Sequence, residues 1–228
     1  MPPLVNPVTI RMISAVVLAP IVLACVYLGG VWFQGLVAGG VIIALMEWVK
    51  LCAGGRVGGG ERWLWLIPGG IYIVLSCLSL ALVRGDDPTG RNLVFFVMAV
   101  VWIADSGAYV CGSLIGGPKL APRISPKKTW AGFIGALVSS GITGSLFFAV
   151  FPDYPITKLC LGAVAVGGVA QIGDLAESLA KRRFDVKDSG SLIPGHGGIL
   201  DRIDGLMAAS LLVGLVSGDT VGGISSWF

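Results

Sequence analysis

The chain has 228 residues, of which 55% are apolar and 13% are charged. Its mean hydropathy of +0.87 lies outside the range of soluble globular domains. The net charge of +3 is not gathered on any soluble segment that could form a basic face, which excludes a nucleic-acid-binding protein. These properties indicate an integral membrane protein.

Apolar segments of helical length fill most of the chain. Each has about 17 to 25 residues, the length that a helix needs to cross ~30 Å of hydrocarbon. The segments cover residues 11–29, 31–51, 63–83, 92–116, 129–151, 157–179 and 199–217, and each boundary is set to within several residues. The sequence therefore predicts an all-α, polytopic integral membrane helical bundle of about seven transmembrane helices, with six to eight as the range. We expect one membrane domain over residues 1–228, with generic helices in 1–91 and the polar clusters in 92–228.

The basic residues are distributed unevenly between the two sides of this arrangement. Of the 16 Lys and Arg residues, only Arg84, Arg91 and Lys158 fall on one side, and the other 13 fall on the opposite side. Lys and Arg accumulate in short cytoplasmic loops. The pattern predicts an odd number of spans with a cytoplasmic N-terminus.

Spaced glycines occur in several of the predicted spans. Gly35 with Gly39, Gly112 with Gly116 and Gly214 with Gly218 each lie about one helical turn apart. Small residues at this spacing let helix backbones approach closely in a membrane. We expect these pairs to lie at helix–helix contacts.

The first polar cluster, WIADSGAY, places Asp105 inside a predicted span. A carboxylate is expensive to bury there, so Asp105 should face a polar cavity, a cation or a basic partner. A hydrogen bond that only packs two helices is the alternative.

The second cluster, SPKKT, covers residues 125–129 at the predicted start of the fifth span. Pro126 near a helix start, free backbone N–H groups and the two lysines Lys127 and Lys128 would make a cradle for an anion. Anchoring by positive charge on the cytoplasmic side would also explain the lysines.

The densest cluster runs from Gln171 to Leu206. Asp174, Ser178 and Lys181 share one helical face, and so do Asp201 and Asp204 on the next helix. These carboxylates reach the same membrane boundary, together with the basic residues Lys181, Arg182, Lys187 and Arg202. An anchor needs only basic residues, whereas this mixture favours divalent cations held between carboxylates and a polyphosphate.

A glycine-rich loop, PGHGG, joins the two helices of this cluster. Its glycines allow a backbone to touch a ligand or adopt positive φ. His196 is the only histidine of the chain, so it cannot build a zinc site with other imidazoles. We expect His196 to hold the loop or a phosphate oxygen, with direct acid–base chemistry as the alternative.

The stretch SLAKRRFDVKDSGSLIPGHGGILDRID, residues 178–204, closely resembles the signature of the phosphatidate cytidylyltransferases, or CDP-diacylglycerol synthases. The Ser, the Lys-Arg and Lys-Asp pairs, the His-Gly-Gly and the final Asp-Arg-x-Asp occur at the family's spacing. Upstream of this stretch, WIADSGAY, the run that ends in Gly117-Pro118-Lys119, SPKKT and QIGDLAES occur in the family's order, so the resemblance extends from Trp102 to the C-terminus. The chain departs from the pattern at Ala180, where a larger aliphatic residue is usual, and at Ala131, where Glu is common.

This resemblance implies that a phosphate oxygen of phosphatidic acid attacks the α-phosphorus of CTP, giving CDP-diacylglycerol and pyrophosphate without a protein nucleophile. It implies a catalytic half in residues 92–228 and Mg²⁺ as cofactor, with a second cation left open. The implied catalytic residues are Asp174, Asp201 and Lys181, and the implied metal ligands are Asp174, Asp201 and Asp204. The implied substrate-binding residues are Ser178, Arg182, Lys187, His196, Arg202, Lys127, Lys128 and Asp105.

The expected partners are CTP, phosphatidic acid and the lipid bilayer, without nucleic acid, and a homodimer is left open. The expected location is a bacterial inner membrane, as a multi-pass protein with the active site facing the cytoplasm. Three other functions remain open at this stage. They are a cytidylyltransferase for an isoprenoid ether lipid phosphate, a transporter of small ions or lipids, and an inactive structural relative.

Overall fold

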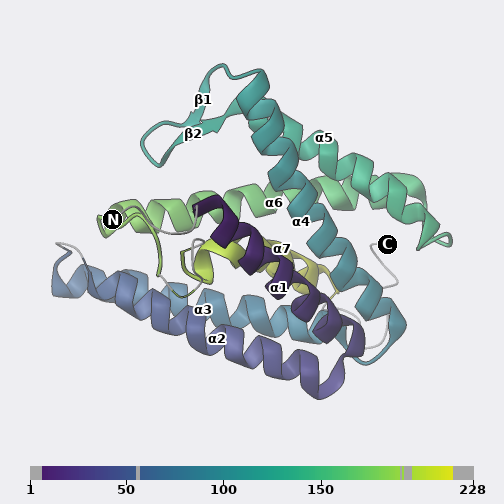
Figure 1. Cartoon of the computed structure of the whole chain (residues 1–228), viewed down its shortest axis with the longest axis horizontal. Coiled ribbons are helices and arrows are strands. Elements are labelled where there is room, and N and C mark those ends of the chain that lie inside the picture. The colour runs from purple at the N-terminus through teal and green to yellow at the C-terminus, as the bar shows by residue number, and fades with distance from the viewer. Residues whose placement is uncertain (1–6, 55–56, 191, 193–196, 218–228) are drawn as a thin grey trace.

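The computed structural model describes residues 7–54, 57–190, 192 and 197–217. Within them the chain forms seven α-helices, a two-stranded antiparallel sheet and a short 3-10 helix, arranged as Figure 1 shows. The helices are α1 (Pro7–Leu28), α2 (Gly30–Ala53), α3 (Gly59–Arg84), α4 (Pro88–Leu114), α5 (Trp130–Leu146), α6 (Ile156–Arg183) and α7 (Leu200–Ser217). The remaining elements are β1 (Lys119–Ala121), β2 (Ser125–Thr129) and η1 (Phe147–Ala149).

Five helices are long and apolar enough to span a membrane: α2, α3, α4, α5 with η1, and α6. The apolar part of α1, Val16–Leu28, is shorter. The first turns of α7 carry Asp201, Arg202 and Asp204, and α7 is not among the five. The chain is therefore a multi-pass membrane protein, and its described residues form seven helices. Five of these helices meet the criteria for spanning, so the prediction of about seven transmembrane helices is not confirmed.

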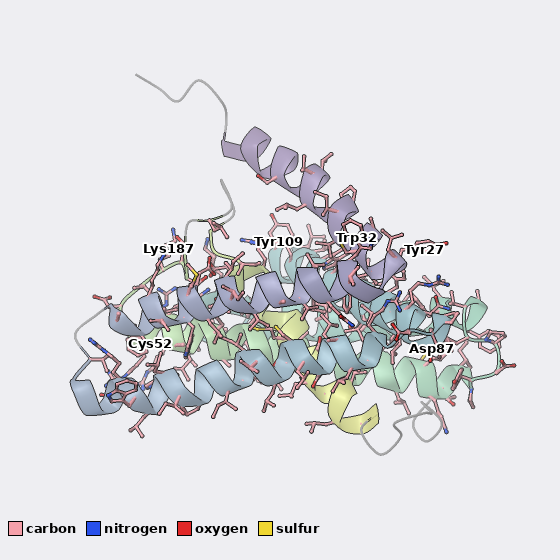
Figure 2. The ribbon with its side chains drawn as sticks, turned by 90° about the horizontal axis from the view of Figure 1, so that it is seen from below. Tyr27, Trp32, Cys52, Asp87, Tyr109 and Lys187 are labelled. Carbon is pink, nitrogen blue, oxygen red and sulfur yellow. The ribbon has the colours of Figure 1, made fainter. Side chains whose placement is uncertain are left out.

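Three apolar clusters hold the described helices together, and the smallest joins α1, α2 and α4 through Val26, Phe33 and Met98. Of the two larger clusters, one joins α2, α3, α6 and α7 through buried residues that include Trp48, Phe184 and Leu200. The other joins α4, α6 and α7 around Phe96 and Val166. Figure 1 shows α2 and α3 side by side, and Figure 2 shows α1 leaning away from the other helices. The end of α6 and the start of α7 thus belong to one packed core.

Glycines bring α4 and α5 into close contact. A Cβ on Gly135 would lie 2.6 Å from the Cys111 Sγ and 2.8 Å from the Gly107 carbonyl oxygen. A Cβ on Gly112 would lie 3.2 Å from the Thr129 hydroxyl. Small residues are therefore required along this contact.

The predicted glycine pairs are confirmed only in part. Gly112 lies at the contact between α4 and α5, and a Cβ on Gly214 would lie 2.6 Å from a side chain of α3. Gly35, Gly39 and Gly116 have no atom within 4 Å of such a Cβ, so their predicted role in packing is wrong for this chain. Gly218 lies outside the described residues.

Basic residues gather at the two ends of the bundle as the sequence predicts. At one end Arg183 pairs with Glu61, and Arg182 donates to the Ile124 carbonyl in the hairpin loop. At the other end Arg84 donates to the carbonyl oxygens of Val26 and Tyr27. Figure 2 shows Lys187 and Cys52 near the first end, and Tyr27, Trp32 and Asp87 at the second.

The segment SPKKT leads into the fifth span as predicted, but Pro126, Lys127 and Lys128 lie in a strand before the helix and not at its first turn, so this part of the prediction is wrong. It forms β2, which pairs with β1 in a hairpin that extends from the junction of α4 and α5 (Figure 1). Helix α5 begins at Trp130, where the Thr129 hydroxyl accepts a hydrogen bond of 3.1 Å from the Gly132 N–H as a helix cap. Pro126 is tolerated because a two-stranded sheet has only edge strands.

Candidate active site

The polar side chains of the sequence clusters meet where α6 ends and α7 begins. Helix α6 contributes Gln171, Asp174 and Lys181, while α7 contributes Asp201 and Asp204. The hairpin adds Lys128 and α4 adds Asp105. Four elements therefore supply one site.

One group of contacts joins the hairpin to α6 and α4. The Lys128 ammonium lies 2.6 Å from Asp174 Oδ2 and donates to Gln171 Oε1 at 3.2 Å. The Gln171 amide donates to Asp105 Oδ1 at 2.8 Å, and the Ser178 hydroxyl donates to Asp174 at 3.3 Å. Asp105 thus reaches its basic partner Lys128 through Gln171, which the sequence reasoning had not considered.

A second group joins α6 to α7 and to the loop between them. The Lys181 ammonium lies 2.6 Å from Asp201 Oδ1 and 3.1 Å from Glu177 Oε2. Asp201 Oδ2 accepts from the Ser189 N–H at 3.0 Å, the Ser189 hydroxyl at 2.9 Å and the Gly198 N–H at 3.0 Å. Burial raises the pKa of Asp201, but Lys181 and these N–H groups outweigh that effect and hold it below its usual range.

Two further carboxylates lie between these groups. Glu177 is buried, its Oε1 accepts no hydrogen bond from an N–H or O–H donor of the described residues, and its carboxyl group lies beside that of Asp204. Asp204 accepts from the Gly205 N–H at 2.7 Å, and burial together with the nearby charge of Asp174 raises its pKa. Glu177 escaped the sequence reasoning, although its i,i+4 spacing to Lys181 is visible in the sequence.

The remaining predicted residues surround these contacts or lie outside the described part of the chain. Lys127, Arg182, Lys187 and Arg202 are exposed. Arg182 contacts the hairpin, and the electrostatic influence of Arg202 extends to Asp105. His196 lies outside the described residues, so its predicted role stays a prediction.

The described residues contain no group of three or more His, Cys, Asp or Glu side chains placed to hold a metal ion. Mg²⁺ sites for polyphosphates commonly use one or two carboxylates and fill the other positions with water and phosphate oxygens. Asp174, with its side chain one-third exposed, and the neighbouring Asp204 have the donor chemistry for such a site.

A cavity of about 370 Å³ approaches the same carboxylates from between the helices. It is lined mainly by apolar and aromatic side chains of α2, α3, α6 and α7, among them Trp48, Trp65 and Tyr72. Glu177 and Asp204 form part of its wall. The apolar cavity therefore adjoins the group of charged side chains at the end of α6 and the start of α7.

Comparison with known proteins identifies the family of this chain. A model of the Cytidylyltransferase family matches residues 60–217. A phosphatidate cytidylyltransferase of Brucella melitensis is 38% identical, over 89% of this chain and 90% of that protein. Relatives of the same name from Haemophilus influenzae and Bacillus subtilis are 46% and 41% identical, over 54% and 60% of this chain and 45% and 51% of their own. This chain therefore belongs to the Cytidylyltransferase family.

Proposed function

We propose that this protein transfers a cytidylyl group from CTP to phosphatidic acid, giving CDP-diacylglycerol and pyrophosphate. The observation that carries the proposal is the pair of lysine–carboxylate contacts, Lys128 with Asp174 and Lys181 with Asp201, at one end of an apolar bundle. Relatives that are named for this reaction cover most of the chain.

The reaction requires two polyanions to approach each other. A phosphate oxygen of phosphatidate forms a bond to the α-phosphorus of CTP while the bond from that phosphorus to the β-phosphate oxygen breaks. Fixed cations offset the repulsion and align the attack. Lys128 and Lys181 are already held in place by carboxylates, and the exposed Lys127, Arg182, Lys187 and Arg202 would bind phosphates around them.

Mg²⁺ fits the residues present. Among the described residues, Asp174, Glu177 and Asp201 contact only two lysines, and Asp204 lies beside Glu177 as a further carboxyl group. Asp174 and Asp204 would hold the ion. Asp201 could become a third ligand only by giving up its contact with Lys181 or with a loop N–H group. When bound, Mg²⁺ would neutralise charge on the phosphates and on the leaving pyrophosphate.

The lipid substrate would reach the site from the side. The acyl chains of phosphatidate remain in the bilayer, and the apolar cavity between α3 and α6 reaches the carboxylates Glu177 and Asp204. The end of the bundle that carries most Lys and Arg would face the cytoplasm of a bacterial inner membrane, where CTP is available.

A transfer assay tests this function. Protein purified in detergent is incubated with phosphatidate, Mg²⁺ and CTP labelled at the α-phosphate, and we expect the label to move into the lipid fraction. Label at the γ-phosphate should leave with pyrophosphate, and chelation of Mg²⁺ should stop the transfer. Asp174→Asn should lower kcat/KM by about 100-fold or more, because it removes a carboxylate that would hold Mg²⁺ and that fixes the Lys128 ammonium.

The same assay distinguishes this function from the other three candidates. Transfer to an isoprenoid ether lipid phosphate in preference to phosphatidate would assign the same chemistry to another lipid. An absence of transfer to either lipid phosphate by folded protein would contradict the proposed reaction and leave the transporter and the inactive relative.

A further inference from the structure

Glu47 is a buried carboxylate in the last third of the chain's second helix, far from the signature segment in sequence. It belongs to α2, and the residue is 5% exposed. Its neighbours on the same helix are apolar residues such as Ala44 and Trp48. An ionisable residue within a candidate membrane span is costly and needs partners that offset the cost.

The hydrogen-bond partners of Glu47 among the described residues come from the start of α7 and from the segment before it. Glu47 Oε1 accepts from the Ile199 N–H at 3.0 Å, and Oε2 accepts from the Leu200 N–H at 2.9 Å. Oε2 also accepts from the Ser189 hydroxyl at 3.3 Å. The first N–H groups of a helix have no partners within the helix, and a negative charge is favoured at that end. Glu47 therefore caps α7 from another helix.

Two glycines of the signature segment pack directly on this carboxylate. A Cβ on Gly190 would lie 2.6 Å from Glu47 Oε1, and a Cβ on Gly198 would lie 2.6 Å from Oε2. A side chain at either position would push Glu47 away from α7. Gly190 and Gly198 are therefore needed because only a residue without a side chain lets the loop approach Glu47 this closely.

Glu47 and Asp201 hold the same piece of chain from opposite sides. The Ser189 hydroxyl lies within hydrogen-bond distance of both carboxylates, 2.9 Å from Asp201 and 3.3 Å from Glu47. The Gly198 N–H binds Asp201, and the next two N–H groups bind Glu47. A shift of the first turn of α7 would therefore move Asp201 relative to Lys181.

We propose that Glu47 is a positioning residue for cytidylyl transfer, which fixes the first turn of α7 and thereby aligns the Asp201–Lys181 pair. This role presupposes the reaction proposed above. The described hydrogen bonds of Glu47 are with Ser189, Ile199 and Leu200, and none of these is a predicted substrate-binding residue. It lies outside residues 60–217, the segment that the family model matches.

Three variants of the full-length protein, purified in detergent, test this role in the transfer assay. Glu47→Gln keeps the size of the side chain but loses its charge and one acceptor, so we expect kcat/KM to fall about tenfold or more. Glu47→Asp keeps the charge and should retain more activity than Glu47→Gln. A role in packing alone predicts the reverse order, because Gln fills the space of Glu and Asp leaves a gap. The matched control, Glu61→Gln, removes a charge from the exposed pair with Arg183 and should stay within about twofold of the parent.

Amide hydrogen exchange gives a second readout that does not depend on activity. Glu47→Gln should speed exchange at Ile199 and Leu200, with exchange in the middle of α6 unchanged. Parent-like exchange and parent-like kcat/KM in this variant would overturn the proposal. If Glu47→Gln does not fold, the same measurements on Glu47→Asp decide, because the shorter carboxylate cannot reach both N–H groups without moving the turn. If the parent transfers no label to phosphatidate, the proposed reaction fails, and exchange at Ile199 and Leu200 still tests whether Glu47 holds the turn.

Discussion

Lys181 stands between two carboxylates that are buried with it. Its ammonium lies 2.6 Å from Asp201 and 3.1 Å from Glu177, and the three side chains are 14%, 8% and 7% exposed. A buried acidic group that loses its cationic partner strongly destabilises a protein. Lys181 is the cationic partner of both Asp201 and Glu177. The same ammonium is available to phosphates that enter the site. Stability and catalysis are therefore coupled at this residue.

Lys181→Met tests this coupling. We expect the variant to lose about 3 kcal/mol or more of stability, because two buried carboxylates remain without their cation. It should also lose transfer activity. Unfolding of the detergent-solubilised protein measures the first effect and the labelled-CTP assay measures the second.

Arg183→Met is the matched control, because the exposed pair of Arg183 with Glu61 contributes little. Adding Asp201→Asn to Lys181→Met should restore part of the stability without restoring activity, since it removes one uncompensated charge. Wild-type stability of Lys181→Met alone would contradict the assigned role.

Contacts between nearby residues could be predicted from the sequence, and contacts between distant ones could not. The i,i+4 spacing placed Ser178 beside Asp174, and the structure shows the hydrogen bond. Glu47 binds the Ile199 N–H across 152 positions, and no pattern in a single sequence indicates such a pair. Gln171 was overlooked because an amide carries no charge, although it links Asp105 to Lys128.

Among the secondary-structure elements, the helices were predictable and the hairpin was not. Long apolar runs specify α2 to α6, because each must satisfy its backbone hydrogen bonds within the membrane. Strands β1 and β2 have only three and five residues and show no alternation of apolar and polar side chains. The hairpin matters for function because it delivers Lys128 to Asp174.

The close contact between α4 and α5 can be tested by adding a side chain to it. Gly135→Val should destabilise the protein by about 1–3 kcal/mol, because the new side chain would collide with Cys111 and the Gly107 carbonyl and separate the helices. Gly35→Val is the control, since a Cβ there has no atom within 4 Å. Thermal unfolding in detergent compares the two variants. Equal midpoints would show that α4 and α5 do not need this close approach.

The whole molecule is polarised along its length. Lys128, Lys181 and their carboxylates lie toward one end, whereas Arg84 and Arg91 lie with Tyr27 at the other. This polarity was visible in the spacing of charges along the sequence, because helices that cross the bundle place successive loops at alternate ends. The number of spans was less certain from the sequence, since α7 combines an apolar second half with three charges in its first five residues.

Labelling from the two sides of the membrane tests the polarity. Arg123, in the hairpin loop, and Asp86, between α3 and α4, are exposed residues with no assigned role in the site. Each is replaced by Cys in an active parent from which Cys25, Cys52, Cys77, Cys111 and Cys160 have been removed. A membrane-impermeant maleimide should modify Arg123→Cys only in inside-out vesicles and Asp86→Cys only in right-side-out vesicles. Modification of both from the same side would contradict the alternation of loops, and the reversed pattern would place the lysine–carboxylate site on the face that CTP does not reach.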